Sequence, residues 1–301
     1  ANDIYKKYEE ICENEKNNYD LIYMRFNPIF PGFIRLTKKY KGKFVFEHNS
    51  IELTEFKANK SVYNVVMSYI FDKSIRKNAF GFVAVTDQIY KYQKSLYGQI
   101  NGICIPNGID VYKYDVRRTP KYDGKNINLL FVGNIRYWHG LDRIMNAIAK
   151  YKKNGKRNIH LTICGPINEK DSLTPLIKEL NLEKSVEFAG PKSQEELNSY
   201  FNKSHLAIGA LGCYRKNIEY ACTLKNREYL SRGIPIVFSE IDEDLPKKYN
   251  KKIYYKVANS DDEINMAKIV LFIDHIYKND AKKLTKEIRT FAENNIDYHI
   301  N

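Results

Sequence analysis

The sequence predicts an α/β protein built from two doubly wound, parallel sheets. Short apolar segments alternate with amphipathic segments along the chain, the rhythm of strand, turn, helix and strand that is typical of parallel sheets. A length of 301 residues is long for one compact core and suits two. A polar run with Pro120 and Gly124 separates the halves. We therefore expect an amino-terminal domain over residues 1–110, a linker over 111–126 and a second domain over 127–301.

The first half contains four predicted strands, fewer than a complete doubly wound domain. Its strands are expected at residues 21–24, 44–46, 81–85 and 102–105, and its helices at residues 31–39 and 87–97. The chain also begins with Ala1 rather than Met. These observations predict that the amino-terminal domain is incomplete.

The second half alternates more regularly and contains six predicted strands. They are expected at residues 128–132, 160–164, 185–188, 206–209, 234–238 and 253–255. Helices are expected at residues 141–152, 174–180, 194–202, 224–231, 262–277 and 281–293. In a doubly wound sheet the ligand lies outside the carboxyl ends of the strands, so the loops that follow these strands are the candidate site.

The charge and composition restrict the partners and the compartment. The 49 Lys and Arg against 36 Asp and Glu leave a net charge of +13, which favours anionic partners, although most of these scattered residues are expected to be solvated. Neither a spanning apolar segment nor a signal peptide is found in the sequence. The five cysteines lack metal-ligand spacing and indicate reduced thiols. We expect a cytoplasmic protein, or one at the inner face of a membrane.

A glycine-bounded loop follows the first strand of the second half. Residues 131–140 read Phe-Val-Gly-Asn-Ile-Arg-Tyr-Trp-His-Gly and lead directly into a predicted helix. Glycines let backbone N–H groups approach an anion, and a helix amino terminus favours negative charge. The loop is therefore a candidate phosphate cradle. The alternative is an ordinary strand-to-helix turn stabilised by Trp138.

A cation and an acid lie three residues apart near the start of a later predicted helix. Lys225 and Glu228 would share one face of that helix. A lysine there can neutralise a diphosphate, and a carboxylate can accept hydrogen bonds from both hydroxyls of a ribose. The alternative is a surface ion pair that contributes only a few tenths of a kcal/mol.

Three stretches together resemble one enzyme family. They are residues 105–110 (Ile-Pro-Asn-Gly-Ile-Asp), residues 131–142 with the Trp-His-Gly loop, and residues 224–237, which begin Leu-Lys-Asn-Arg-Glu-Tyr. Their order and spacing resemble those of the retaining glycosyltransferases of family 4, in the subgroup with a Trp-His-Gly loop. The resemblance covers about residues 19–291 and implies the GT-B fold, in which two Rossmann-like domains face a cleft.

The resemblance implies roles for individual residues of the second domain. Lys225 and Arg136 would act in catalysis at the diphosphate, and Glu228 would bind the donor ribose. The other residues expected at the donor site are Gly133, Asn134, His139, Gly165, Pro166, Phe188, Arg215, Glu219, Tyr220 and Leu224. No metal and no other cofactor is expected, since the two cations would take the place of Mg²⁺ and no Asp-x-Asp ends a strand; residues 242–244 resemble a solvated loop.

The sequence departs from the family's pattern at two places. Asn134 and His139 occupy positions where many relatives have Arg and Lys, so Arg136 is a substitute by proximity. The family also has two Glu separated by seven residues, and counting back from Glu228 gives Tyr220, with Glu219 beside it. The first carboxylate is either shifted by one residue or lost, which affects how the donor sugar is held.

In the first domain, polar residues end two predicted strands and would therefore face the cleft between the domains. His48 is the expected contact to the transferred sugar or the acceptor and is included among the catalytic residues, with Arg25 and Glu47 on the acceptor side. The alternative for His48 is a histidine whose hydrogen bonds are satisfied within the fold.

The resemblance implies transfer of a sugar from a UDP- or GDP-sugar to an acceptor hydroxyl, with retention and without a metal. A bacterial surface polysaccharide or glycan, on a lipid-linked acceptor at a membrane, is the expected context. Two alternatives stay open: a nucleotide-sugar hydrolase or epimerase of the same fold, and a basic module that binds nucleic acid. The latter is disfavoured because the sequence has no RNP, KH or helix-turn-helix signature and its 24 tyrosines are dispersed.

Overall fold

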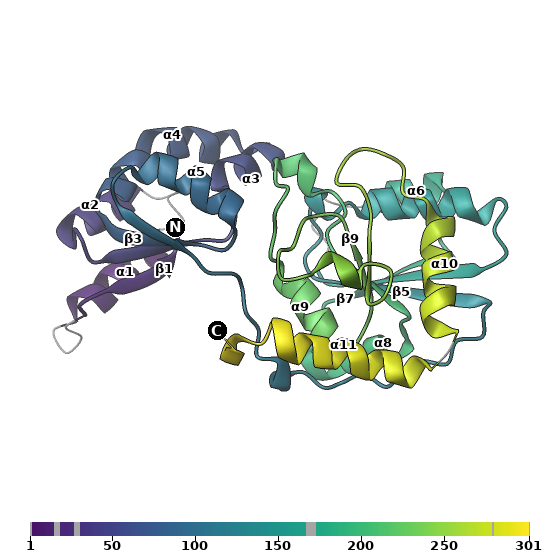
Figure 1. The fold of residues 1–301 in the computed structure, drawn as a ribbon. Coiled ribbons are helices and arrows are strands. Elements are labelled where there is room, and N and C mark those ends of the chain that lie inside the picture. The colour runs from purple at the N-terminus through teal and green to yellow at the C-terminus, as the bar shows by residue number, and fades with distance from the viewer. Residues whose placement is uncertain (1, 15–18, 27–30, 167–172, 279, 301) are drawn as a thin grey trace. The chain divides into compact units, whose positions relative to one another are not determined.

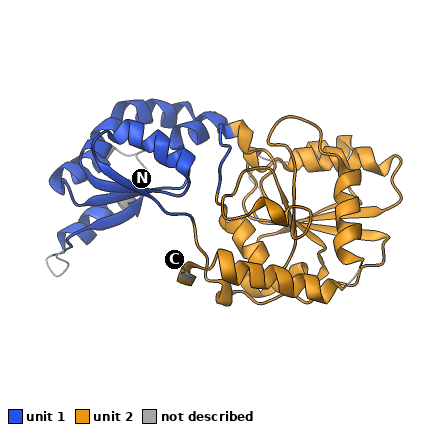
Figure 2. Ribbon diagram, in the orientation of Figure 1, with its two compact units in different colours: residues 1–106, 216–221 blue, residues 107–215, 222–301 orange. Residues whose placement is uncertain are grey.

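The computed structural model of the protein describes residues 2–14, 19–26, 31–166, 173–278 and 280–300. The chain folds into two compact units (Figure 2). Unit 1 comprises Ala1–Pro106 and Lys216–Ala221, and unit 2 comprises Asn107–Arg215 and Cys222–Asn301. The short segment Lys216–Ala221 thus belongs to unit 1 although it lies within the second half of the sequence. Among the described residues, no helix has the length and apolar character needed to cross a bilayer.

Unit 1 is built on a parallel sheet in which the strands follow their order in the chain. The four strands are β1 (Ile22–Arg25), β2 (Phe44–His48), β3 (Ala79–Ala84) and β4 (Asn101–Cys104). The helices are α1 (Asn2–Glu13), α2 (Pro31–Lys39), α3 (Glu52–Ala58), α4 (Val62–Lys77) and α5 (Asp87–Tyr97). Stacked and edge-on rings of Phe33, Phe44 and Phe46 fill the space between the sheet and α2.

The sequence analysis predicted the four strands, α2 and α5, but it assigned no helix to α1, α3 or α4. The pattern of α4 explains why that helix was not recognised. Its fully buried residues are Ser68, Ile75 and Arg76, two of which are polar, while several of its large apolar side chains are exposed. Because apolar residues do not mark the buried face, the usual helical periodicity gives no signal.

Unit 2 is a six-stranded parallel sheet with the order β10-β9-β8-β5-β6-β7. The strands are β5 (Asn126–Val132), β6 (Asn158–Cys164), β7 (Val186–Gly190), β8 (Leu206–Ile208), β9 (Ile236–Phe238) and β10 (Tyr254–Lys256). The helices are α6 (Leu141–Lys152), α7 (Thr174–Glu179), α8 (Gln194–Lys203), α9 (Leu224–Ser231), α10 (Met266–Tyr277) and α11 (Ala281–Asn295). Each predicted strand of this half is present, so the doubly wound architecture is confirmed (Figure 1).

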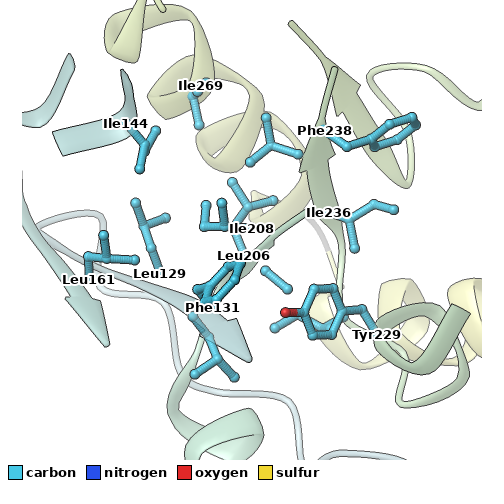
Figure 3. Close-up of a cluster of buried hydrophobic side chains, with 14 of the residues drawn as sticks. Leu129, Phe131, Ile144, Leu161, Leu206, Ile208, Tyr229, Ile236, Phe238 and Ile269 are labelled. Atoms are coloured by element: carbon cyan, nitrogen blue, oxygen red, sulfur yellow. The ribbon is translucent and has the colours of Figure 1, made fainter. Parts of the chain in front are cut away.

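The strand order places a topological switch point between β5 and β8. The chain runs outward from β5 through β6 to β7, then returns to β8 on the other side of β5 and continues to β10. Ligands of doubly wound sheets bind at the carboxyl ends of the two strands where the order reverses. The central strands carry fully buried apolar side chains, among them Leu129, Phe131 and Ile208 (Figure 3).

The segment 111–126, which we expected to be a linker, packs within unit 2. It begins with the 3₁₀ helix η1 (Val111–Lys113). The buried side chain of Arg117 donates hydrogen bonds to the carbonyl oxygens of Ser204 and Gly233 and to the hydroxyl of Tyr277. A polar composition suggested a solvated connection, but this arginine satisfies backbone groups that would otherwise be buried without partners.

The ends of β5 and β6 approach each other so closely that only glycine fits. The N–H of Gly133 donates to the carbonyl oxygen of Cys164 at 2.8 Å. Gly165 has φ of +154°, and a Cβ atom added to it would lie 2.1 Å from the carbonyl oxygen of Gly133. Two consecutive strand ends are therefore joined by backbone contact at the edge where a ligand of this fold binds.

Replacing Gly165 with alanine is expected to lower the free energy of unfolding by about 3 kcal/mol, because both the overlap and the backbone conformation are unfavourable. The matched control is Gly124→Ala, where φ is +68° but no atom lies within 4 Å of the added Cβ. That substitution should cost only about 1 kcal/mol. Urea unfolding of both variants measures the difference, and equal losses would contradict the close contact.

Candidate functional site

The candidate site lies at the carboxyl edge of the unit 2 sheet, at the switch point between β5 and β8. The loop after β5 begins at Gly133, and α9 follows the segment after β8. Tyr229 of α9 is fully buried, and its hydroxyl accepts a hydrogen bond from the N–H of Val132 at 2.8 Å and donates to the carbonyl oxygen of Val132 at 3.3 Å. This pair of hydrogen bonds fixes α9 against the end of β5.

Lys225 lies one turn before Tyr229 on α9, so its position follows from that attachment. Its Nζ atom lies 4.3 Å from the ring centre of Phe131, the penultimate residue of β5, whose side chain is fully buried. Burial raises the pKa of Glu240, which follows β9, and the positive charge of Lys225 opposes this rise. The ammonium group therefore lies near the ends of both β5 and β9, where a bound anion would interact with it.

Glu228, on α9, is held by a buried arginine that directly follows this helix. Its Oε1 atom accepts a hydrogen bond from Nε of Arg232 at 2.9 Å, and its side chain retains 19 % exposure. Arg232 in turn donates to Oδ1 of Asn198 at 2.6 Å. A carboxylate that is oriented by a neighbouring arginine and is partly exposed to solvent can accept further hydrogen bonds, as binding of a ribose would require.

The glycine-bounded loop leaves β5, passes through the 3₁₀ helix η2 (Tyr137–His139) and enters α6. Gly140 has φ of +65°, and an added Cβ would lie 2.9 Å from the backbone of Leu211. The His139 ring lies 5.2 Å from the Phe131 ring, which Lys225 also contacts. The structure thus brings His139 and Lys225 to one aromatic ring. Asn134 is exposed, and Arg136 is half-buried at the start of η2.

Arg215, which we expected at the donor site, braces this loop. Its two Nη atoms each lie 2.7 Å from one carboxylate oxygen of Asp142, and Nη1 donates to the carbonyl oxygen of Tyr137 at 2.8 Å. The guanidinium also stacks on the Tyr137 ring at 4.3 Å. Despite partial burial, the hydrogen bonds to Asp142 raise the pKa of Arg215. The arginine connects η2 to the start of α6.

Three other expected residues lie in β7 or directly after β6. Gly165 directly follows β6 and contacts Gly133, and the exposed Pro166 comes next. Phe188 is half-buried in β7, where it is in register with Ile163 of β6. Gly165 and Pro166 therefore lie at the same carboxyl edge as the loop.

Glu219 and Tyr220 belong to unit 1, not to the unit that contains Lys225 and Glu228. The N–H groups of both residues donate to Oε1 of Gln88 on α5, each at 3.0 Å. Leu224 begins α9 in unit 2 and is 56 % exposed. The internal contacts of unit 2 therefore assemble only part of the residue set that the resemblance implies.

In unit 1, His48 is fully buried at the end of β2. Its Nδ1 atom lies 2.7 Å from Oε1 of Glu52, and its Nε2 atom lies 3.0 Å from the Tyr97 hydroxyl. With both ring nitrogens occupied, the arrangement is that of a structural histidine. Arg25 is exposed, and it lies in register with Glu47, whose Oε2 atom accepts a hydrogen bond from the hydroxyl of Tyr23 at 2.6 Å.

The sequence analysis missed Glu240, a fully buried acid that follows β9. Its Oε1 atom accepts a hydrogen bond from Nδ2 of Asn226 on α9 at 3.0 Å, and Oε2 accepts one from the N–H of Ser239 at 3.3 Å. Burial raises the pKa of Glu240 to about 7, and the charge of Asp242 adds to this while Lys225 opposes it. Its position as an acid two residues after the predicted strand 234–238 was the signal that would have identified it.

The expectation that residues 242–244 form a solvated loop was wrong for Asp242. Its side chain is buried, and its Oδ2 atom lies 2.6 Å from Nη1 of the fully buried Arg227. Arg227 also forms an ion pair with Asp244. The Sγ atom of Cys222 and one carboxylate oxygen of each of these two acids lie within 4.8 Å of one another, an arrangement that could hold a cation. The guanidinium of Arg227 already neutralises the carboxylates that such a cation would need.

The match to a known protein family falls mainly in unit 2. Residues 115–247, which include the glycine-bounded loop and α9, match the family model of glycosyl transferases group 1. A comparison with curated protein sequences finds no significant match.

Solved structures resemble the whole chain. Sucrose-phosphate synthase from Thermosynechococcus elongatus aligns over 99 % of this chain and 74 % of its own, with a TM-score of 0.70 and 15 % identity. The fold is that of the GT-B glycosyltransferases. A glycosyltransferase from Rickettsia africae ESF-5 gives a TM-score of 0.65 over 99 % and 77 % of the two chains at 18 % identity. Anabaena HepE in complex with UDP-glucose gives 0.66 over 98 % and 78 % at 15 % identity. The predicted GT-B fold is thus confirmed.

Glu240 makes the stability of this GT-B protein depend on pH. The folded state holds a proton on Glu240 that the unfolded state releases near the ordinary glutamate pKa of 4.5. The contribution of the group is therefore fully favourable below about pH 4.5 and is lost as the pH rises through about 7. The shift corresponds to about 3 kcal/mol.

The variant Glu240→Gln should lack this dependence, because its amide does not ionise. Urea unfolding at about pH 5 and about pH 8 measures the effect. Relative to the variant, the wild type should lose about 3 kcal/mol of unfolding free energy between these pH values. Parallel pH profiles of the two proteins would show that Glu240 ionises normally.

Proposed function

We propose that this protein transfers a sugar from a nucleoside diphosphate-sugar to an acceptor hydroxyl, with retention at the anomeric carbon. The observation that carries the proposal is the position of Lys225. Its ammonium group lies on Phe131 beside the end of β5, at the switch point where this fold binds ligands. The match of residues 115–247 to glycosyl transferases group 1 supports a sugar-transfer reaction at this position.

The chemistry to be catalysed is the departure of a diphosphate as positive charge develops on the sugar. In our proposal Lys225 and Arg136 stabilise the negative charge that accumulates on the leaving group. The N–H groups of the loop that begins at Gly133 face the same anion. Glu228, oriented by Arg232, accepts hydrogen bonds from the ribose hydroxyls.

We further propose that these fixed cations replace a metal ion. A preorganised cation needs no reorganisation at the moment of bond cleavage, which is the source of its catalytic effect. The complex of HepE with UDP-glucose supports a uridine donor for our protein, and GDP is the alternative.

The acceptor in our proposal is a lipid-linked glycan of a bacterial surface polysaccharide, which the protein meets at the inner face of a membrane. The net charge of +13 supports this part of the proposal, because anionic lipids attract basic proteins.

Calorimetric titration with UDP and with GDP tests the donor site. Lys225→Met retains the apolar contact with Phe131 but removes the charge, and Glu228→Gln retains an acceptor for Arg232. Each variant is expected to bind the preferred nucleotide at least about tenfold more weakly, because a charged hydrogen bond is lost. The control is Lys286→Met, on the exposed face of α11. Undiminished nucleotide binding in both site variants would contradict the proposed site. If the protein instead binds oligonucleotides in a salt-dependent manner and does not bind UDP, the result would favour a nucleic-acid-binding module.

Turnover with a lipid-linked or simple glycoside acceptor tests retention and metal independence together. NMR of the product should give the anomeric configuration of the donor, and the rate should be unchanged by EDTA. An inverted product, or a rate that EDTA abolishes and Mg²⁺ restores, would contradict the proposed mechanism. Release of free sugar in the absence of an acceptor would instead indicate a hydrolase.

A further inference from the structure

The helix α4 of unit 1 has an exposed apolar face. Val62 is 75 % exposed, Tyr69 is 64 % exposed and Ile70 is 59 % exposed, and Tyr63 and Val66 are also exposed. These positions follow the spacing i, i+1, i+4, i+7 and i+8, so the side chains lie on one side of the helix. We refer to these five residues as the α4 stripe. An apolar surface of this extent on one helix usually marks an interaction site.

A polar network holds the opposite side of α4 in place. Arg76, buried in unit 1, forms an ion pair with Asp72 at 3.0 Å and donates to Oε1 of Gln93 on α5 at 3.2 Å. Gln93 donates to Oε2 of Glu52 on α3 at 3.0 Å. Because these polar contacts determine which side of α4 faces inward, the apolar stripe is presented outward by the fold itself. Figure 1 shows α3, α4 and α5 grouped in this unit.

Exposed lysines flank the stripe. Lys57, on α3, places its Nζ atom 5.9 Å from the centre of the Tyr69 ring. Lys73 and Lys77 are exposed at the carboxyl end of α4, and Lys60 is exposed just before the helix. Residues 56–71 include no acidic residue. The nearby acids are engaged within unit 1, Glu52 with His48, Glu55 with Lys216 and Asp72 with Arg76.

A groove continues the apolar surface toward α5. It has a volume of about 350 Å³, and its lining includes Leu53, Tyr69, Lys73 and Leu96, together with the paired groups Glu52, Asp72 and Arg76. Leu96 is itself 43 % exposed. The surface therefore combines aliphatic and aromatic side chains with a border of lysines, the composition of a segment that lies in the interface of a bilayer.

We propose that the α4 stripe, with Lys57, Lys60, Lys73 and Lys77, is the surface by which this protein docks on an anionic lipid bilayer. The helix lies along the membrane with its apolar side chains among the acyl chains, while the lysines contact the lipid phosphates. Self-association through the same face would bring these lysines together, so their charge favours a lipid partner over a second copy. This inference deepens the membrane part of the proposed function.

Flotation with lipid vesicles tests the docking surface without any nucleotide or sugar, so its outcome is independent of the donor site. The full chain is expected to float with vesicles of phosphatidylcholine and phosphatidylglycerol in equal amounts, and to remain unbound with phosphatidylcholine alone. The apolar variant is Val66→Gln with Ile70→Gln. Its control is Val116→Gln with Leu271→Gln, which removes two exposed aliphatic side chains from unit 2.

The charge variant is Lys57→Gln with Lys73→Gln, and its control is Lys282→Gln with Lys286→Gln on α11, which changes the net charge equally. The apolar and charge variants should each lower the partition coefficient at least about tenfold, and both controls should bind within about twofold of the wild type. Circular dichroism checks that every variant is folded.

Three results would overturn the inference: absence of wild-type binding to anionic vesicles, equal losses in variants and controls, or a dimer in sedimentation that Val66→Gln with Ile70→Gln dissociates. The last result would assign the stripe to a second copy of the chain. If UDP binds normally while any of these results is obtained, the docking surface is contradicted and the proposed donor site is not. If UDP fails to bind while flotation is normal, only the transferase proposal is contradicted.

Discussion

The arrangement of the candidate site depends on one buried hydroxyl. Tyr229 hydrogen bonds through its phenol to both backbone groups of Val132, and thereby attaches α9 to the last residue of β5. Burial raises the pKa of the Tyr229 hydroxyl, so the phenol stays protonated and can donate as well as accept. Because a helix is rigid over one turn, this attachment also determines where Lys225 lies. The position of the cation is thus a consequence of core packing.

Unit 2 supports this edge with acidic side chains that each have a hydrogen-bond donor beside them. Glu228 is partly open and is oriented by the buried Arg232, whereas Glu240 is fully buried and is held by Asn226. The buried Arg227 neutralises Asp242, which is also buried. Buried charges without partners would be strongly destabilising, so each acid that leaves solvent is accompanied by a donor. The polar groups that remain accessible are those that a ligand can engage.

The sequence was sufficient to predict the strands of both units, but not all the helices of unit 1. All ten strands that the structure describes were predicted, since apolar runs bounded by turn residues are local signals. The helix α4 was not predicted, because two of its three buried residues, Ser68 and Arg76, are polar, while its outer face carries Val66 and Ile70. The same inversion that concealed the helix leaves an apolar surface in contact with solvent. A local pattern cannot give this orientation, because Gln93 and Glu52 determine it from other helices.

The sequence by itself determined the strand and helix order, the glycines around the loop, and the spacing of Lys225 and Glu228 on one helix face. These are properties of neighbouring residues and of the backbone conformations they allow. Only the tertiary structure decided that Lys225 rests on Phe131, that Arg215 braces the loop through Asp142, and that the buried His48 places its Nε2 atom against the Tyr97 hydroxyl. Burial and hydrogen-bond partners depend on segments that are distant in the chain, and they set the pKa and the accessibility of each side chain.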